Sequence, residues 1–189
     1  FSYLVLLDKK VISPEKLNEI KSFLWNELNN RDSALTPAIM KKILNRPLRV
    51  CGVVKNTGAP GGGPFWVRNI NTPPTLQIVE MSQIDLNNQD HQTIVENATH
   101  FNPVDIVCGL KNYKGQKFDL LKFVDTKSGI ITTKSQDGKS LKALELPGLW
   151  NGAMAYWNSV FVEMPLKTFN PVKTVNDLLN EEHQPRKKK

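Results

Sequence analysis

The sequence predicts an α/β fold in which an N-terminal helical segment precedes a mixed β-sheet. Three observations favour this fold: two helix-start signals before residue 45, a run rich in branched residues directly after them, and a hairpin signal in the second half. The chain has 189 residues, of which 40% are hydrophobic and 23% are charged. This length and composition are typical of a globular protein with a core of its own and exclude a disordered chain.

Two helices are expected within residues 1–46. Ser13-Pro14 supplies a hydroxyl N-cap and a proline at the first helical position, and Thr36-Pro37 repeats this pattern before a shorter helix over 38–44. Residues 1–7 are typical of the middle of a helix, so we expect the chain to be a piece of a longer protein. After Ser13-Pro14, apolar residues follow at helical spacing: Leu17, Ile20, Phe23, Leu24 and Leu28.

Strands dominate the remainder of the chain. Residues 48–55 are rich in branched side chains and apolar on both faces, which predicts a central strand. Asp137-Gly138 lies between two short segments and indicates a type I′ hairpin. The run 104–110 is consistent with a strand or a buried helix. Further strands are expected at 65–67, 76–82, 129–134, 141–146 and 160–164, and short helices at 89–96 and 172–179.

Positive charge is concentrated at the C-terminus. The net charge is +7, and Arg186–Lys189 supply four of these positive charges. We therefore expect three parts: a helical segment at 1–46, a mixed-sheet portion at 47–185 and a basic tail at 186–189. A terminal basic run is usually a solvated tail, so nucleic-acid binding through it is the weakest of the functional alternatives.

The two cysteines and the hydropathy pattern bear on location. Cys51 and Cys108 each lie within an apolar run, and neither has a histidine or a second cysteine at metal-ligand spacing. They are expected to be buried free thiols in a reducing, cytoplasmic compartment, with a disulfide as the alternative. No apolar run approaches the ~18 residues of a membrane span, so no membrane partner is expected.

The stretch 146–173 has an unusual set of side chains around one short apolar strand. Trp150, Asn151 and Lys173 offer an aromatic wall, an amide and an ammonium group, which suit a flat polar ligand with one negative charge. Lys173 stands at the start of a predicted helix, where the dipole disfavours a cation unless a phosphate is bound there. The alternative is a buried strand with ordinary aromatic packing, with Trp157 and Phe161 in the core.

Other candidate site residues lie in and beside the predicted strands. Gly52 interrupts a strand, which indicates that something approaches the backbone closely. Glu80 follows an apolar run and either faces solvent or accepts hydrogen bonds from ligand hydroxyls. Asn102 and Asp105 lie at element edges, where turn formation is the alternative to ligand binding. The loop Gly61–Gly63 lacks the lysine and hydroxyl of a phosphate-binding loop and is predicted to be a hairpin loop.

Four motifs occur in a characteristic order: Arg-Val-Cys-Gly-Val-Val at 49–54, Leu-Gln-Ile-Val-Glu-Met-Ser-Gln-Ile at 76–84, Phe-Asn-Pro-Val-Asp-Ile at 101–106, and Phe-Val-Glu-Met-Pro-Leu-Lys-Thr-Phe-Asn-Pro-Val-Lys at 161–173. This series resembles the later half of the UDP-sugar pyrophosphorylases, particularly UDP-N-acetylhexosamine pyrophosphorylase, over residues 48–176. The chain more closely resembles, over most of residues 1–185, the C-terminal part of a bacterial family described as a domain of unknown function.

The resemblance implies the C-terminal half of a nucleotidyltransferase-like (nucleotide-diphospho-sugar transferase, GT-A-like) fold. In such a fold Gly52 would lie against the sugar ring, Glu80 would bind sugar hydroxyls, and Lys173 would bind the phosphate that joins sugar to nucleotide. By the same resemblance, the catalytic residue is Lys173 and the substrate-binding residues are Gly52, Glu80, Asn102, Asp105, Trp150 and Asn151.

Two positions depart from the pyrophosphorylase pattern. Met81 stands where the family has tyrosine, and Asp105 stands where it has the asparagine of its Phe-Asn-x-x-Asn loop. An aspartate accepts sugar hydroxyls but does not donate to an acetamido oxygen, which argues against an N-acetyl sugar.

The implied function is therefore to bind the sugar phosphate in a protein that forms nucleotide sugars from a sugar 1-phosphate and a nucleoside triphosphate. The implied partners are a sugar phosphate or nucleotide sugar and the N-terminal half of the same protein. The implied cofactor is Mg²⁺, with most of its ligands outside this chain. The fragment alone is expected to be inactive, so enzyme activity depends on that N-terminal half. The alternative is a non-catalytic binding or interaction module that retains the fold.

Overall fold

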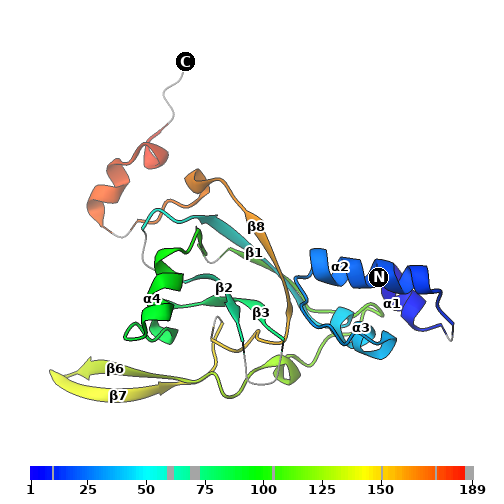
Figure 1. Cartoon of the computed structure of the whole chain (residues 1–189). Coiled ribbons are helices and arrows are strands. Elements are labelled where there is room, and N and C mark those ends of the chain that lie inside the picture. Colours follow the sequence, from blue (N-terminus) through cyan, green and yellow to red (C-terminus); the bar gives the residue numbers. More distant parts are fainter. Residues whose placement is uncertain are drawn as a thin grey trace.

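The computed structural model describes residues 1–9, 11–58, 62–68, 73–103, 105–149, 151–172 and 174–185. Three helices, α1 (Ser2–Leu7), α2 (Pro14–Asn26) and α3 (Pro37–Leu44), gather at one end of the molecule (Figure 1). Both predicted N-caps are confirmed, because the Ser13 and Thr36 hydroxyl oxygens accept hydrogen bonds from Lys16 N and Ile39 N at 3.4 and 3.3 Å. Helix α1 covers residues 2–7 of the segment 1–7 that was expected to be helical, and Phe1 is its N-cap.

The helices have a core of their own. Since α2 and α3 place apolar residues three and four positions apart, each has one apolar face, and α1 covers part of both. Each such side chain contributes roughly 1.5–3 kcal/mol on burial. The buried members are Leu7, Ile20, Leu24, Met40 and Ile43. Among the described residues no helix is long and apolar enough to cross a bilayer.

Strand β1 (Leu48–Lys55) lies at the centre of the main sheet, as predicted. On one side it pairs in parallel with β8 (Asn158–Glu163). On the other side it pairs antiparallel with β5 (Ile106–Gly109) along its first half and with β4 (His100–Phe101) along its end. The run 104–110 thus contains a strand and not a buried helix.

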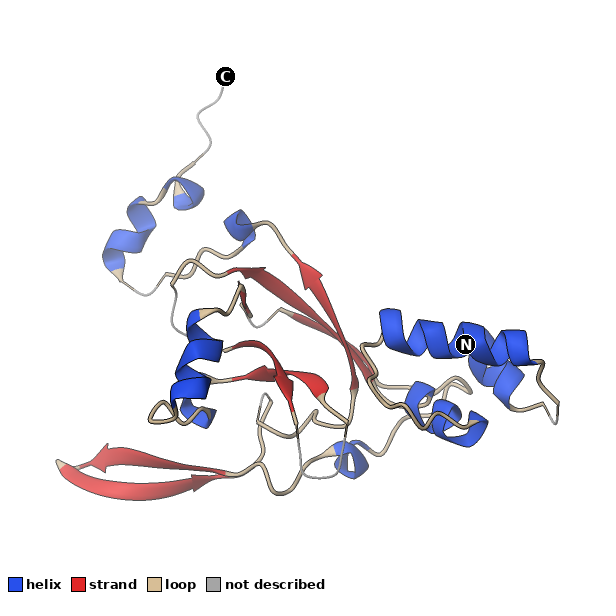
Figure 2. Cartoon of the chain, viewed as in Figure 1, coloured by secondary structure: helices blue, strands red, loops and turns tan. Residues whose placement is uncertain are grey.

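Two further ribbons complete the β structure (Figure 2). Strand β2 (Gly63–Val67) pairs with β3 (Thr75–Val79), and β6 (Ile130–Gln136) pairs with β7 (Lys139–Glu145) in a hairpin that projects away from the body. Asp137 and Gly138 both have positive φ, 52° and 75°, which confirms the predicted type I′ turn.

The remaining elements are short. Helix α4 (Gln89–Glu96) is found as predicted, and the side chain of Asn88 caps it. The strand expected at 76–82 ends at Val79, because Glu80 begins a 3₁₀ turn, η1 (Met81–Gln83). The helix expected at 172–179 is a 3₁₀ helix, η4 (Val175–Leu179). Other 3₁₀ turns are η2 (Leu120–Phe123), η3 (Leu166–Thr168) and η5 (Glu181–His183).

The two cysteines are free, as expected, but only one is buried. Cys51 in β1 is fully buried, and burial raises the pKa of its thiol. The prediction that Cys108 is buried is wrong. Cys108 and its neighbour Val107 point to opposite faces of β5 and are both exposed, so neither face of this edge strand is covered at that point.

The molecule exposes more surface than its mass requires. Its accessible surface is 13460 Å², whereas a compact protein of 21.4 kDa exposes roughly 9,000 Å². The helices and the β6–β7 hairpin lie at opposite ends (Figure 1), and large apolar side chains remain uncovered along the sheet and hairpin. Examples are Val107, Ile131, Leu144 and Val162.

Candidate functional site

A bulge in the edge strand surrounds Gly52. Because Cys51 pairs with Ile106 and Val54 pairs with Phe101, two residues of β1 face the four positions 102–105. The Gly52 N–H donates to the Asp105 carbonyl oxygen at 2.8 Å, and Asn102 Nδ2 donates to the Gly52 carbonyl oxygen at 2.7 Å. Asn102 is only 3% exposed. Three predicted site residues therefore meet in one bulge, which we call the Gly52 bulge (Gly52, Asn102 and Asp105).

Gly52 is in close contact, as its residue type predicted, and the neighbour is Met164. A Cβ atom at this position would lie 2.5 Å from Met164 Cε, 2.8 Å from Met164 Sδ and 3.2 Å from Asp105 Cβ. The Met164 thioether therefore covers the surface that the resemblance assigns to a sugar ring. Since methionine side chains adapt readily, this cover is a movable one.

Glu80 joins the same region through the backbone of Gly62. A Cβ atom on Gly62 would lie 3.5 Å from Glu80 Cα, and the Gly62 carbonyl accepts a hydrogen bond from Asn102 N at 2.9 Å. Glu80 also begins η1, where its N–H donates to Gln83 Oε1 at 2.9 Å in a capping box. The predicted hairpin loop at 61–63 is not found among the described residues, because Gly63 is already part of β2 and β2 pairs with β3 and not with β1. Gly61 lies outside the described residues.

A cavity of about 290 Å³ adjoins this junction, and we call it the Gly62 cavity. Its volume is near the lower limit for small-molecule sites. Met81, which departs from the pyrophosphorylase pattern, and Phe101, the first residue of the Phe-Asn motif, both line this cavity. Its lining includes Gly62, Gly63, Met81, His100 and Phe101.

His100 adds a polar group that the sequence did not single out. Its Nε2 lies 3.1 Å from Glu163 Oε2, and its Nδ1 lies 2.8 Å from Thr99 Oγ1. His100 and Glu163 come from strands on opposite sides of β1, so the pair spans the central strand near its carboxyl end. A sequence with only three histidines gives no spacing that reveals this pairing.

Of the remaining three predicted site residues, only Asn151 belongs to the described part of the chain, and its printed hydrogen bonds stay within its own turn. Asn151 lies in the turn before β8, where its Oδ1 accepts from Gly148 N at 2.6 Å and its Nδ2 donates to Leu146 O at 3.4 Å. Trp150 and Lys173 lie outside the described residues. Trp157 is 7% exposed, in agreement with its predicted core position.

Arg49 is the most buried charged residue among those described, and it is not one of the predicted site residues. It is 1% exposed, its Nε donates to Ser159 Oγ at 2.7 Å, and its Nη2 donates to Gln77 Oε1 at 2.6 Å. Both partners are neutral, and burial lowers the pKa of the Arg49 guanidinium. The only signal for it was one basic residue within an apolar strand.

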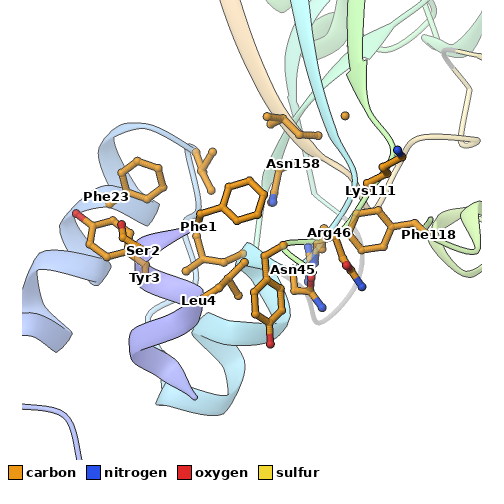
Figure 3. A pocket seen from close by; sticks show the side chains of 16 residues that line it. Phe1, Ser2, Tyr3, Leu4, Phe23, Asn45, Arg46, Lys111, Phe118 and Asn158 are labelled. Carbon is orange, nitrogen blue, oxygen red and sulfur yellow. The ribbon is translucent and has the colours of Figure 1, made fainter. Parts of the chain in front are cut away.

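A second cavity, of about 450 Å³, lies between α1 and the start of β1 (Figure 3). Phe1, Tyr3 and Arg46 line it, and none of the predicted site residues does. Metal ligands are also not assembled: within the described part of the chain, no three His, Cys, Asp or Glu side chains could hold a metal ion together.

Comparison with solved structures returns UDP-glucose pyrophosphorylases at low identity. A Trypanosoma brucei protein described as a UDP-glucose phosphorylase is 17% identical over 97% of this chain and 42% of its own length, with a TM-score of 0.47. A Leishmania major variant in complex with UDP-glucose is 16% identical over 82% of this chain and 34% of its own, with a TM-score of 0.47. Another is 16% identical over 87% and 39%, with a TM-score of 0.43.

The chain thus spans less than half the length of each of these proteins. Comparison with curated proteins gives no match. One protein family matches nearly the whole sequence, over residues 1–184, and its description is a domain of unknown function, DUF4301. This chain belongs to that family.

Proposed function

We propose that the chain is the sugar-phosphate-binding portion of a nucleotidyltransferase-like protein that forms nucleotide sugars. The observation that carries the proposal is the convergence of three separate motifs at the Gly52 bulge and the Gly62 cavity. Asn102 bonds to both Gly52 and Gly62, and Gly62 packs against Glu80. Gly52, Glu80 and Asn102, which come from three motifs separated in the sequence, thereby share one junction beside β1.

In this proposal each residue type has a specific task. The Glu80 carboxylate accepts hydrogen bonds from sugar hydroxyls, which are neutral donors. Gly52 and Gly62 let the sugar approach the backbone, with Met164 moving aside. Lys173 places an ammonium group against the sugar phosphate and neutralises charge as the phosphate oxygen attacks the α-phosphorus of the nucleotide, from which pyrophosphate leaves.

The nucleotide is bound by a companion portion of the protein, and one observation supports this. The chain leaves a large apolar surface uncovered, which a neighbouring domain would bury. In this proposal most ligands of the Mg²⁺ also belong to the companion portion. The chain by itself is expected to be inactive.

The test measures pyrophosphate release from UTP and glucose 1-phosphate by the protein that carries the companion portion. We expect turnover, its loss in Lys173→Ala, and normal turnover in the control Lys139→Ala, since Lys139 is an exposed lysine at the start of β7 and belongs to none of the four motifs. The 189-residue chain assayed alone should release no pyrophosphate. Turnover by that chain alone would show that the division of tasks is wrong.

A non-catalytic binding module is the second candidate. Met81 in the cavity wall, Asp105 in the bulge and Met164 over Gly52 favour it, because each replaces or covers a feature of the pyrophosphorylase pattern. Titration of the same protein with UDP-glucose separates the two candidates. Saturable binding of UDP-glucose without pyrophosphate release supports the binding module. A protein that neither binds UDP-glucose nor releases pyrophosphate would exclude both candidate functions.

A further inference from the structure

A third cavity has a chemistry of its own. It has a volume of about 420 Å³, within the range of small-molecule sites, and lies between α3, β3 and the turn at 152–157. We call it the α3–β3 cavity. Neither the Gly52 bulge nor Glu80 contributes to its lining, so its role is independent of the proposed sugar-phosphate site.

Basic side chains exceed acidic ones around this cavity. Arg31, Lys42 and Arg46 line it, against Asp32 and Asp125. Both carboxylates are already engaged by their own turns. Asp32 Oδ1 accepts from Ala34 N at 2.9 Å, while Asp125 accepts from Lys127 N at 3.0 Å and from the Ser128 hydroxyl at 2.9 Å.

Arg46 is the least satisfied of these cations. Its side chain is half-buried, burial lowers the pKa of its guanidinium, and Asp32 provides only a through-space attraction. Among the residues that the structure describes, it forms no hydrogen bond and no ion pair. Arg31, in contrast, is held between the rings of Trp25 and Trp66, at 4.1 and 5.1 Å, and donates to Trp25 O at 2.8 Å.

A buried positive charge stands directly behind the cavity wall. Gln77 lines the cavity and accepts the hydrogen bond from Arg49, whose other partner is the hydroxyl of Ser159. A buried guanidinium with neutral partners alone is costly, and a nearby anion offsets that cost. The wall also contains Trp157, whose buried Nε1–H finds no acceptor among the residues that the structure describes. The guanidinium groups of Arg46 and Arg49 would therefore be stabilised by a negatively charged ligand in the cavity, and such a ligand could also accept the Trp157 Nε1–H.

Apolar and aromatic residues form a large part of the remaining lining, among them Ile39, Ile78, Pro74, Tyr156 and Trp157. Polar residues are interspersed with them, namely Asn30, Thr75, Gln83 and Ser128. The apolar part of the lining favours a ligand with a hydrophobic body, whereas a bare inorganic ion would leave it in contact with water. We propose that the α3–β3 cavity binds a small anion with an aromatic or apolar body, and that Lys42 and Arg46 hold its charged group.

The test uses two fluorescent probes that differ in charge. The aromatic sulfonate 8-anilinonaphthalene-1-sulfonate carries the anion, and N-phenyl-1-naphthylamine has a similar aromatic body without it. In fluorescence titration of the folded 189-residue chain, the uncovered apolar surface should bind both probes weakly, and one tighter site should appear for the sulfonate. Lys42→Gln and Arg46→Gln should each weaken it about fivefold, with little effect on the neutral probe. The control Lys21→Gln, on the exposed face of α2, should change neither.

The location is checked by the indole N–H signals of the four tryptophans in a ¹⁵N-labelled sample. Trp157→Phe assigns one signal, and that signal should shift on addition of the sulfonate. Thermal unfolding curves of the variants verify that each is folded. Sulfonate binding that is unchanged in both Lys42→Gln and Arg46→Gln would overturn the proposal, and so would a Trp157 signal that does not move.

Discussion

Asn102 Nδ2 donates a 2.7 Å hydrogen bond to the carbonyl oxygen of Gly52, across the gap where the edge strand bulges away from β1. The bulge removes the regular ladder partner of that carbonyl, and the Asn102 amide replaces it. The contact joins residues 50 positions apart and fixes the two motifs that the proposed site needs. It also means that Asn102 has a structural task, whatever it does toward a ligand.

Asn102→Ala should therefore lower the stability of the folded chain. The Gly52 carbonyl would remain buried without this partner, which costs about 1–3 kcal/mol in the free energy of unfolding. Urea denaturation followed by circular dichroism measures the change. Asn87→Ala is the matched control, because Asn87 lies in an exposed turn with Asp85 and its loss should cost less than about 0.5 kcal/mol. Equal costs for the two variants would show that the Asn102 bond contributes nothing specific.

Two glycines near the bulge should respond differently to an added methyl group. In Gly52→Ala the new Cβ meets the end of the Met164 side chain, which can rotate away, so the expected cost is about 1 kcal/mol. In Gly63→Ala it would lie 2.8 Å from the His100 carbonyl oxygen, and backbone cannot move aside so easily. The expected cost is about 3 kcal/mol.

Urea denaturation of Gly52→Ala and Gly63→Ala shows directly which variant loses more stability. Shortening the Met164 side chain provides a second check. In a Met164→Ala background, Gly52→Ala should lower the free energy of unfolding by less than it does in the unaltered chain. If Gly52→Ala proves the more damaging of the two, Met164 is held rigidly and does not act as a movable cover.

The sequence predicted the local features of this fold well. The N-caps Ser13 and Thr36 and the turn at Asp137-Gly138 depend on neighbouring residues only, so their signals are contained in short segments. The central position of β1 also followed from its apolar faces. The bulge at 102–105 did not, because it results from pairing between strands 50 residues apart and has no local signature.

For the candidate site, the sequence identified residues and not their arrangement. Gly52 was selected because glycine inside a strand indicates close approach, and the structure supplies Met164 as its neighbour. Arg49 was missed, since a single basic residue in a strand does not reveal that its guanidinium is buried against Ser159 and Gln77. The roles of Trp150 and Lys173 stay predictions.

The two cysteines should differ in reactivity and in their effect on stability at alkaline pH. Exposed Cys108 should react with iodoacetamide in the folded chain, whereas buried Cys51 should not, and mass spectrometry of peptides distinguishes them. Burial raises the pKa of the Cys51 thiol, so above about pH 8.5 the unfolded chain releases this proton while the folded chain keeps it. The free energy of unfolding contributed by Cys51 therefore falls as the pH rises.

Cys51→Ala isolates that contribution. Its stability should decline less than that of the unaltered chain between about pH 8 and pH 10. Parallel declines in the two proteins would show that the Cys51 thiol ionises equally in the folded and unfolded states.

Asp105 offers the sharpest test of sugar preference, because its backbone and side chain have separate tasks. Its carbonyl oxygen accepts the Gly52 N–H, and its side chain is exposed. Asp105→Asn preserves the backbone contact and restores the amide of the pyrophosphorylase pattern. An amide can donate to an acetamido oxygen, which a carboxylate cannot do. The protein with its companion portion should then bind UDP-N-acetylglucosamine about tenfold more tightly, while UDP-glucose affinity changes little. Calorimetric titration with both nucleotide sugars measures this ratio, and an unchanged ratio would place Asp105 away from the sugar.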